Sequence, residues 1–534
     1  MSAGTVDDLE GAAQAWQGDL EELEARRARA LLAGGADKIQ GEHDRGRLTA
    51  RERIDRLFDP GSFVEAGKLA VVPIRDSDGN LIEKLPSSQL CGFGTVNGRR
   101  VAVVAEDYTV AKGIATKGIL EKQKGVLSGY GEQLALAWEI PLVAFLQGVG
   151  GDIGPLEHLN YQHMVSGHDV TPLFELLDTV PMVTAVMGPL AGGSAARAVC
   201  AHFSLMSRPN GCLFSGGPPL VERSLGQKVD KFELGGHEIH TQGMGSIDNA
   251  CDTEEEIIAQ IKRFLSYLPD NVYQLPPRRE ATDPVDRSCD ELLEIVPNHP
   301  RRIFEPRAVI GCIFDRDSFC EIGPEWGRSL ITGFARIGGV AVGVLASDAR
   351  HLGGAMDVNA ADKQRRFVDV CDTFHVPIVY LSDNPGFMIG TESERAGVLL
   401  HGLRALQAIA GARVPVITIQ MRRCFGMGGQ ATGNPSHLSI KLVWPSAVLG
   451  DMPIEGGVAA SYRKQIEAAP DPAAKLREIE ERMRGQTSVW QTAEHFGLED
   501  VLDPRETRRA IYRWLEGALE NIRAEPATGP KNRF

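Results

Sequence analysis

The chain contains the same pattern of residues twice. GFGTVNGRRVAVVAED begins at residue 92 and GFARIGGVAVGVLASD begins at residue 333, and the two segments align without a gap at an offset of 241 residues. Further pairs follow in the same order, IPLV (140–143) with VPIV (376–379) and VPMVT (180–184) with VPVIT (414–418). Because each copy must build the same elements around its own core, this repeat predicts a duplicated domain.

The length of the chain agrees with a duplication. Its 534 residues are too many for one ordinary core and suit two domains of roughly 200 to 250 residues each. The stretch 268–306 is rich in proline and charged residues, which favours an extended connection between domains. We therefore expect an N-terminal domain over residues 1–280 and a C-terminal domain over residues 281–534.

Local patterns predict an α/β fold. Apolar residues recur every three or four positions over residues 7–32, which predicts an amphipathic helix. Thr49 followed by Glu52 resembles a capping box and predicts a helix that ends before Asp59-Pro60-Gly61. Short β-rich runs alternate with longer helix-compatible stretches in both copies. These runs are residues 101–105, 141–147, 182–188, 377–383 and 415–421.

Composition excludes some classes of protein. A formal net charge of −14 argues against nucleic-acid and anionic-membrane binding. The chain has no run of 18 apolar residues that would predict a membrane-spanning helix. Its first residues are acidic and do not match a secretory signal peptide, so we expect a cytoplasmic protein. The nine cysteines are widely spaced and contain no CxxC pair, which favours reduced, buried thiols and no metal site.

A glycine cluster follows the third repeated run in each copy. Glycine tolerates left-handed backbone conformations, so successive N–H groups can converge there, and the N-terminus of a following helix adds partial positive charge. Each cluster therefore predicts an oxyanion hole, and two holes suit a reaction in which two oxyanions develop. The two predicted turns are Gly192-Gly193-Ser194 and Gly426-Met427-Gly428.

Other chemical interpretations fit these residues less well. Residues 426–431 also match the GxGxxA pattern of dinucleotide-binding turns, but Asn434-Pro435 interrupts the helix that should follow. Ser194 lacks a GxSxG elbow, so a hydrolase nucleophile is disfavoured. Two arginine pairs, 365–366 and 422–423, are open to a role in binding anionic groups or to salt bridges.

Seven segments spread over residues 40 to 520 form a recognisable set. They are RERIDRLFDPGSFVE (51–65), GFGTVNGR (92–99), MGPLAGGSA (187–195), FELGGHEIHTQGMGSID (232–248), DVNAADKQRRFVDVCDTFHVPIVYLSDNPGFMIGT (357–391), FGMGG (425–429) and WPSAVLG (444–450). In these segments the chain resembles the carboxyltransferase (β) subunits of biotin-dependent acyl-CoA carboxylases, of the propionyl-CoA and methylcrotonyl-CoA carboxylase type.

The resemblance implies a fold and a reaction. It implies two tandem crotonase-like ββα superhelix domains in a homohexamer, a trimer of dimers. In such enzymes carboxybiotin delivers its CO2 to the α-carbon, or the vinylogous γ-carbon, of an acyl-CoA through an enolate. By this analogy Gly192 and Gly193 are catalytic residues that hold the acyl-CoA oxyanion, while Met427 and Gly428 are catalytic residues that hold the ureido oxygen of biotin. The substrate-binding neighbours that the analogy implies are Ala191, Ser194, Gly426, Gly429 and Gln430. No Ala-Met-Lys-Met segment is present, so biotin is expected on a partner subunit with biotin carboxylase and biotin carrier functions.

Some residues depart from the family pattern. Residues 147–152 read QGVGGD where many relatives have DGAGAR, and FGMGGQ (425–430) differs from the propionyl-type YGGAY and leans toward methylcrotonyl-type loops. The acyl group therefore stays open. So do two other roles, a biotin-dependent acyl-CoA decarboxylase subunit and a non-catalytic assembly paralogue.

Overall fold

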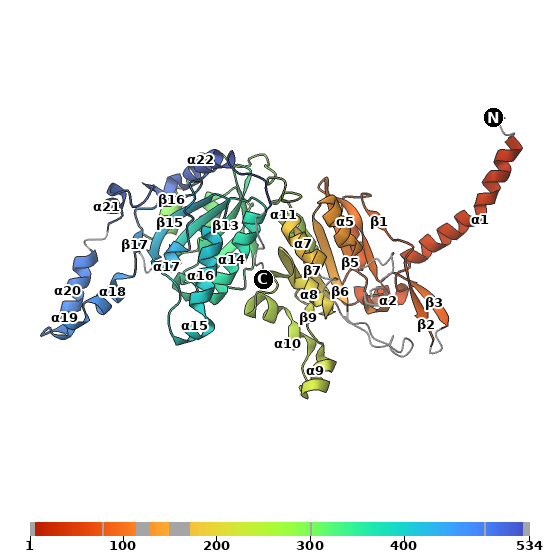
Figure 1. Ribbon diagram of the computed structural model, residues 1–534, viewed down its shortest axis with the longest axis horizontal. Helices are drawn as coiled ribbons and strands as arrows, with labels where there is room; N and C mark the ends of the chain where they lie inside the picture. Colours follow the sequence, from red (N-terminus) through yellow and green to blue (C-terminus); the bar gives the residue numbers. More distant parts are fainter. Residues whose placement is uncertain are drawn as a thin grey trace. The chain divides into compact units, whose positions relative to one another are not determined.

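The computed structural model describes residues 6–76, 80–113, 129–148, 171–299, 302–484 and 488–526 (Figure 1). The chain divides into two compact units. The first comprises Met1–His237 with Ala250–Lys262, and the second comprises Glu238–Asn249 with Arg263–Phe534. A short segment from the first half of the sequence thus packs with the second unit. The functional assignment of residues 1–280 and 281–534 to two domains stays a prediction.

The first unit is built on an eight-stranded sheet of order β1-β4-β5-β6-β7-β8-β10, with β9 paired to β7. A hairpin joins β4 and β5 in antiparallel pairing, and β5, β6, β7 and β8 then run parallel. The strands are β1 (Val64–Ala66), β4 (Gln89–Val96), β5 (Arg99–Glu106), β6 (Leu142–Gly148), β7 (Met182–Ala191), β8 (Phe203–Ser207), β9 (Cys212–Phe214) and β10 (Asn249–Cys251).

The second unit repeats this topology. Its eight-stranded sheet has the order β11-β12-β13-β14-β15-β16-β18, with β17 paired to β15. The strands are β11 (Cys320–Ile322), β12 (Leu330–Ile337), β13 (Val340–Ser347), β14 (Ile378–Asn384), β15 (Val416–Phe425), β16 (Ile440–Val443), β17 (Val448–Gly450) and β18 (Asp500–Val501). The position of each strand in one sheet has its equivalent in the other, so the duplication predicted from the sequence is confirmed.

The correspondence extends to individual side chains. The hydroxyl of Thr184 in β7 donates to the carbonyl of Ala198, and the hydroxyl of Thr418 in β15 donates to the carbonyl of Thr432. Both bonds span 14 residues. Each bond therefore closes the segment that follows the central strand, and this segment contains the glycine cluster in both units.

The predicted helices at the N-terminus are present. Helix α1 (Val6–Leu31) covers the amphipathic stretch, and α3 (Ala50–Leu57) begins with the capping box of Thr49 and Glu52. Among the described residues, the remaining helices of eight residues or more are α2 (Ala36–His43), α5 (Tyr130–Trp138), α7 (Thr171–Thr179), α9 (Pro218–Leu225), α11 (Glu254–Leu265), α13 (Pro306–Ile313), α14 (Val358–Thr373), α16 (Val398–Ala410), α18 (Ile454–Ser461), α20 (Pro472–Arg484) and α22 (Thr507–Leu519). Shorter elements are α8 (Gly193–Val199), α10 (Lys231–Gly235), α12 (Leu292–Ile295), α15 (Thr391–Ala396), α17 (Gly426–Gln430), α19 (Arg463–Glu467), α21 (Val489–Glu494) and the ribbon of β2 (Val71–Arg75) and β3 (Leu81–Pro86).

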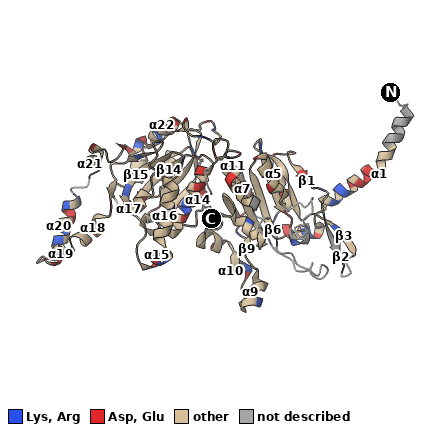
Figure 2. Ribbon diagram, in the orientation of Figure 1, with Lys and Arg blue, Asp and Glu red and all other residues tan. Residues whose placement is uncertain are grey.

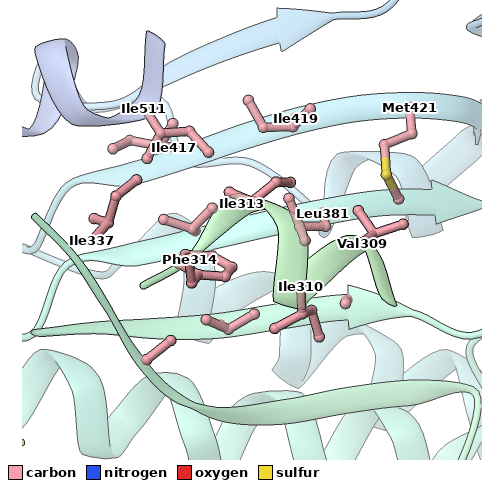
Figure 3. Packing of buried hydrophobic residues seen from close by; sticks show 14 of the residues in the cluster. Val309, Ile310, Ile313, Phe314, Ile337, Leu381, Ile417, Ile419, Met421 and Ile511 are labelled. Carbon is pink, nitrogen blue, oxygen red and sulfur yellow. The ribbon is translucent and has the colours of Figure 1, made fainter. Parts of the chain in front are cut away.

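Helices cover both faces of the second sheet, which explains why successive residues of β12, β13 and β14 are all buried rather than alternately buried and exposed. On one face Phe334 of β12 contacts Phe367 of α14, and the hydroxyl of Tyr380 in β14 donates to Gln364 of the same helix. On the opposite face the strands meet α13 and α22. Figure 3 shows this core, with Val309, Ile310, Ile313 and Phe314 of α13, Ile511 of α22, and Ile337, Leu381, Ile417, Ile419 and Met421 of the strands.

Charged residues of both signs are interspersed along the outer helices (Figure 2). Ion pairs within α1 join Arg26 to Glu22 and Arg27 to Glu24, and a similar pair in α20 joins Lys475 to Glu478. Within the described ranges, no helix has the length and apolar character needed to cross a membrane. The nine cysteines are free thiols, and most are buried, as predicted.

Candidate functional site

The first glycine turn joins β7 to α8. Gly192 follows Ala191 with φ 66° and ψ −131°, a left-handed conformation that favours glycine, and it is the N-cap of α8. Gly192 and Gly193 are exposed, whereas Ala191 and Ser194 are partly buried. A Cβ built on Gly193 would have no atom within 4 Å. Since the first N–H groups of a helix have no partner within it, the turn presents amide donors beside open space.

A buried carboxylate lies beneath this turn. Glu106, the last residue of β5, accepts a hydrogen bond from the hydroxyl of Ser194 (2.8 Å) and another from the main-chain N–H of Gln147 (2.8 Å). The guanidinium of Arg197 lies 3.8 Å from Glu106 and also pairs with Glu132. Burial raises the pKa of Glu106, and the charge of Arg197 acts against that shift. The side chain of Ser194 is thus held inward, and its N–H is the group it can offer to a ligand.

The second glycine turn joins β15 to α17. Gly426 has φ 55°, again in the left-handed region, and a Cβ there would lie 3.1 Å from the carbonyl oxygen of Asp451. Met427 and Gln430 are exposed, while Gly428 and Gly429 are buried. A Cβ on Gly428 would lie 2.7 Å from main-chain atoms of Gly386. The turn is therefore packed closely on its inner side and open at Met427.

Asn384, the last residue of β14, holds this second turn. Its Nδ2 donates to the carbonyl of Gly428 (3.1 Å), and its Oδ1 accepts from the N–H of Gly386 (2.8 Å). Asn384 is only 2% exposed and its bond to Gly428 is buried, so leaving the amide group unpaired there is costly.

The two turns occupy equivalent places in the two sheets. Gly192, Gly193 and Ser194 match Gly426, Met427 and Gly428 at an offset of 234 residues. The structure thus brings Ala191 to Ser194 together at the end of β7 in the first unit, and Gly426 to Gln430 together at the end of β15 in the second.

The arginine pair at 422–423 is salt-bridged. Arg422 and Arg423 both bind the carboxylate of Asp383, and the N–H of Arg423 donates to the same group. Burial acts to raise the pKa of Asp383, but the hydrogen bonds and charges of Arg423 and Arg422 outweigh it and hold the pKa below its ordinary value. Arg366 donates to the carbonyl of Gly245 and lies over the ring of Trp326. These three arginines are thus engaged in contacts within the second unit.

The structure also bears on other interpretations of the sequence. Helix α17 has five residues, too short to continue a dinucleotide-binding turn into a long helix. His202 is buried, and its two ring nitrogens contact the N–H of Met182 and the carbonyl of Leu177, which is a structural role. In the part of the chain that the structure describes, no group of three or more His, Cys, Asp or Glu residues could hold a metal ion. Residues 149–152 of the altered loop lie outside the described residues.

Glu106, Asp383 and Asn384 were not predicted as functional residues from the sequence. The repeat could have drawn attention to Glu106, because the two copies differ at this position and the aligned residue in the second copy is Ser347. A glutamate at the end of a strand that is buried on both faces requires a partner, and its replacement by serine in the other copy marks a difference between the two turns.

Comparisons with known proteins show the family to which this chain belongs. The family model described as "Carboxyl transferase domain" matches residues 41–532. The propionyl-CoA carboxylase carboxyltransferase subunit of Haloferax mediterranei is 33% identical over 513 residues, covering 95% of this chain and 97% of that protein. The propionyl-CoA carboxylase beta chain of Roseobacter denitrificans is 32% identical over 506 residues, covering 92% and 95%.

A solved structure resembles the whole chain. The crystal structure of transcarboxylase 12S, described as a hexamer and containing methylmalonyl-CoA and methylmalonic acid, matches with a TM-score of 0.84 and 29% identity, covering 99% of this chain and 98% of that one. The chain therefore belongs to the carboxyl transferase family, as a carboxyltransferase subunit of the biotin-dependent acyl-CoA carboxylase type built from two crotonase-like α/β units.

Proposed function

We propose that this chain transfers a carboxyl group from carboxybiotin to the α-carbon, or the vinylogous γ-carbon, of an acyl-CoA, and that the two glycine turns stabilise the oxyanions of this reaction. The observation that carries the proposal is the pair of equivalent turns. Each follows the corresponding strand of a repeated sheet, begins with a glycine in a left-handed conformation and presents exposed residues at the start of a short helix.

The first turn suits the thioester oxygen of an acyl-CoA. The N–H groups of Gly192 and Gly193 are the proposed donors, with Ala191 and Ser194 beside them. When a proton leaves the α-carbon, negative charge develops on the thioester oxygen, and fixed amide donors stabilise this charge without reorganising. The open space above Gly193 admits a ligand atom close to the main chain.

The second turn suits an oxygen of a different group. Carboxybiotin, borne by a partner subunit, would supply the carboxyl group and leave negative charge on its ureido oxygen. The N–H groups of Met427 and Gly428 are the proposed donors, Gly426 shapes the turn, and Gly429 and Gln430 lie behind it. Main-chain amides fit this oxygen, because they donate and carry no charge of their own that would attract competing anions to the site.

The proposal includes an assembly. Transcarboxylase 12S is described as a hexamer and the similarity to it covers nearly the whole of both chains, which supports a homohexamer, a trimer of dimers, for this protein. Biotin carboxylase and the biotin carrier would belong to a partner subunit. We expect this complex to work in the cytoplasm.

The names of the relatives point to short acyl groups. Propionyl-CoA is named for the relatives from Haloferax and Roseobacter, and methylmalonyl-CoA is bound in transcarboxylase 12S. The loop FGMGGQ (425–430), with Gln430 exposed, makes methylcrotonyl-CoA the second substrate to test.

The test is to purify the chain from its host with its partners, probe for a biotinylated subunit, and measure labelled bicarbonate incorporation into acetyl-, propionyl- and methylcrotonyl-CoA. The proposal predicts ATP-dependent and avidin-sensitive incorporation into at least one of them. ATP-independent release of CO2 from a carboxylated CoA would show a decarboxylase instead. A chain that binds neither acyl-CoA nor biotin in calorimetric titrations would be an assembly paralogue, and the proposal would be wrong.

A further inference from the structure

The carboxylate of Glu106 has no task in the reaction proposed above, although it is completely buried. Its Oε2 accepts from the main-chain N–H of Gln147 near the end of β6, and its Oε1 accepts from the hydroxyl of Ser194 in α8. One side chain thus connects the ends of β5 and β6 with the turn that follows β7. Both oxygens are engaged within the protein, so Glu106 is unsuited to act on a substrate directly.

The second unit shows which of the two hydrogen bonds of Glu106 occurs only in the first unit. There the N–H of Asp383, which matches Gln147, donates to the hydroxyl of Ser347, which matches Glu106 (3.1 Å). The bond between the two strand ends is therefore common to both units and can be made by a serine. The additional length of glutamate is not needed for it.

The bond from Glu106 to the turn is the difference between the units. Ser194 is matched in the second unit by Gly428, which has no side chain to bind, and Asn384 instead holds the carbonyl of Gly428. The two units thus anchor equivalent turns by different groups. In the first unit the anchor is a carboxylate and a hydroxyl, and in the second it is an amide and a main-chain carbonyl.

We propose that Glu106 is a positioning residue for the first glycine turn. Through the hydroxyl of Ser194 it fixes the direction in which the N–H groups of Gly192 and Gly193 point. Arg197, one turn further along α8, supports this arrangement by pairing with Glu132. The inference rests on the proposed function, because it assigns the fixed amides to the acyl-CoA oxygen. Oxyanion donors must be held to within about half an ångström, so a small loss of order at Ser194 has a large effect on the reaction.

The test compares Ser194→Ala, Glu106→Ala and Glu106→Gln in the complete enzyme complex. The first readout is amide hydrogen exchange in residues 188–199 and, for comparison, residues 421–433. The second is kcat and KM for the acyl-CoA alongside KM for the carboxybiotin-bearing partner. Glutamine can still accept from the N–H of Gln147 and donate to the hydroxyl of Ser194, so Glu106→Gln is the conservative variant.

We expect Ser194→Ala and Glu106→Ala to accelerate exchange in residues 188–199 by about tenfold or more while residues 421–433 stay as in the wild type. The value of kcat/KM for the acyl-CoA should fall by about tenfold or more, with KM for the biotin-bearing partner unchanged. Glu106→Gln should stay within about threefold of the wild type in both measurements. The double alanine variant should be no worse than Glu106→Ala, because the two residues act through one bond.

Asp315→Asn is the matched control. Asp315, which follows α13, is also buried and also accepts two main-chain N–H groups and a bond from an arginine, Arg508. The N–H groups are those of Gly338 and Gly339, so its carboxylate holds the turn of the β12–β13 hairpin rather than a glycine turn of the site. Its substitution should lower the melting temperature and leave exchange in residues 188–199 and kcat/KM for the acyl-CoA unchanged.

Wild-type exchange in residues 188–199 of both Ser194→Ala and Glu106→Ala would overturn the inference. Equal acceleration in both glycine turns would also overturn it, because that pattern indicates a loss of general stability. If Glu106→Ala fails to fold, Ser194→Ala and Glu106→Gln decide the question alone. Hydrogen exchange needs no turnover, so an inactive wild-type complex would contradict the proposed function while the exchange result still decides the role of Glu106.

Discussion

The amide of Asn384 donates a hydrogen bond to the main-chain carbonyl of Gly428, 3.1 Å away, in the interior of the second unit. This bond fixes the peptide at the centre of the proposed biotin-binding turn. The same side chain also accepts from Gly386, against which Gly428 packs. The packing of Gly428 against Gly386 therefore depends on the buried side-chain amide of Asn384.

Asn384→Asp tests this dependence. The carboxylate has the same shape but cannot donate while ionised, so it would face the carbonyl of Gly428 unpaired at a cost of roughly 1 to 3 kcal/mol. We expect kcat/KM for the carboxybiotin-bearing partner to fall by about tenfold, with KM for the acyl-CoA near the wild-type value. Equal losses on both substrates in steady-state kinetics would contradict a role confined to the second turn.

Gly428→Ala tests the packing of the second turn. The added methyl group would lie 2.7 Å from main-chain atoms of Gly386, and main chain cannot move aside as a flexible side chain can. Overpacking of this kind costs about 1 to 3 kcal/mol. Thermal unfolding should show a lower melting temperature, and transfer should be lost. An unchanged melting temperature with normal turnover would show that the turn is looser than described.

Lys363 predicts a pH dependence of stability. Its ammonium group is buried in the second unit, where it donates to the carbonyls of Trp326 and Leu330, and burial lowers its pKa to about 7. An unfolded chain would keep this lysine protonated up to about pH 10.4. Between these values the unfolded state binds a proton that the folded state lacks, so this group adds stability as the pH rises from 7.

The measurement compares apparent melting temperatures of the wild type and Lys363→Met from pH 7 to 9.5. The difference between the two proteins should grow in favour of the wild type as the pH rises, and taking the difference removes the contribution of the titrating cysteines. Lys475→Met, which removes a surface ion pair with Glu478, should run parallel to the wild type. Parallel curves for Lys363→Met would show that Lys363 is charged in the folded protein over this range.

The repeat in the sequence was enough to predict two similar α/β units, because the local patterns of the strands occur twice. The capping box of Thr49 and Glu52 could be predicted equally well, since both of its hydrogen bonds join residues close together in the sequence. The glycine turns were found for the same reason. Their distance from the repeated strands is the same in both copies.

The packing of residues 238–249 with the second unit was not predicted. It depends on contacts between distant residues, such as the side chain of Asn249 with the N–H of Gly323, and on the bond from Arg366 to Gly245. Periodicity carries no information on such pairs. Glu106 and Asn384 were missed for the same reason. Each acts on a turn 44 to 88 residues away, and only the alignment of strand ends brings them together.

The main-chain N–H of Gly193 gives the most direct test of the oxyanion-hole account. Gly193 is the first residue of α8, where proline fits helix geometry, and a Cβ there meets no atom within 4 Å. Gly193→Ala keeps the N–H, whereas Gly193→Pro removes it, so the two variants differ in the donor itself. In bicarbonate incorporation by the intact complex, we predict that Gly193→Ala stays within about tenfold of the wild type and that Gly193→Pro falls by a further 10²- to 10³-fold or so, with assembly unchanged. Near-normal turnover of Gly193→Pro would contradict the account.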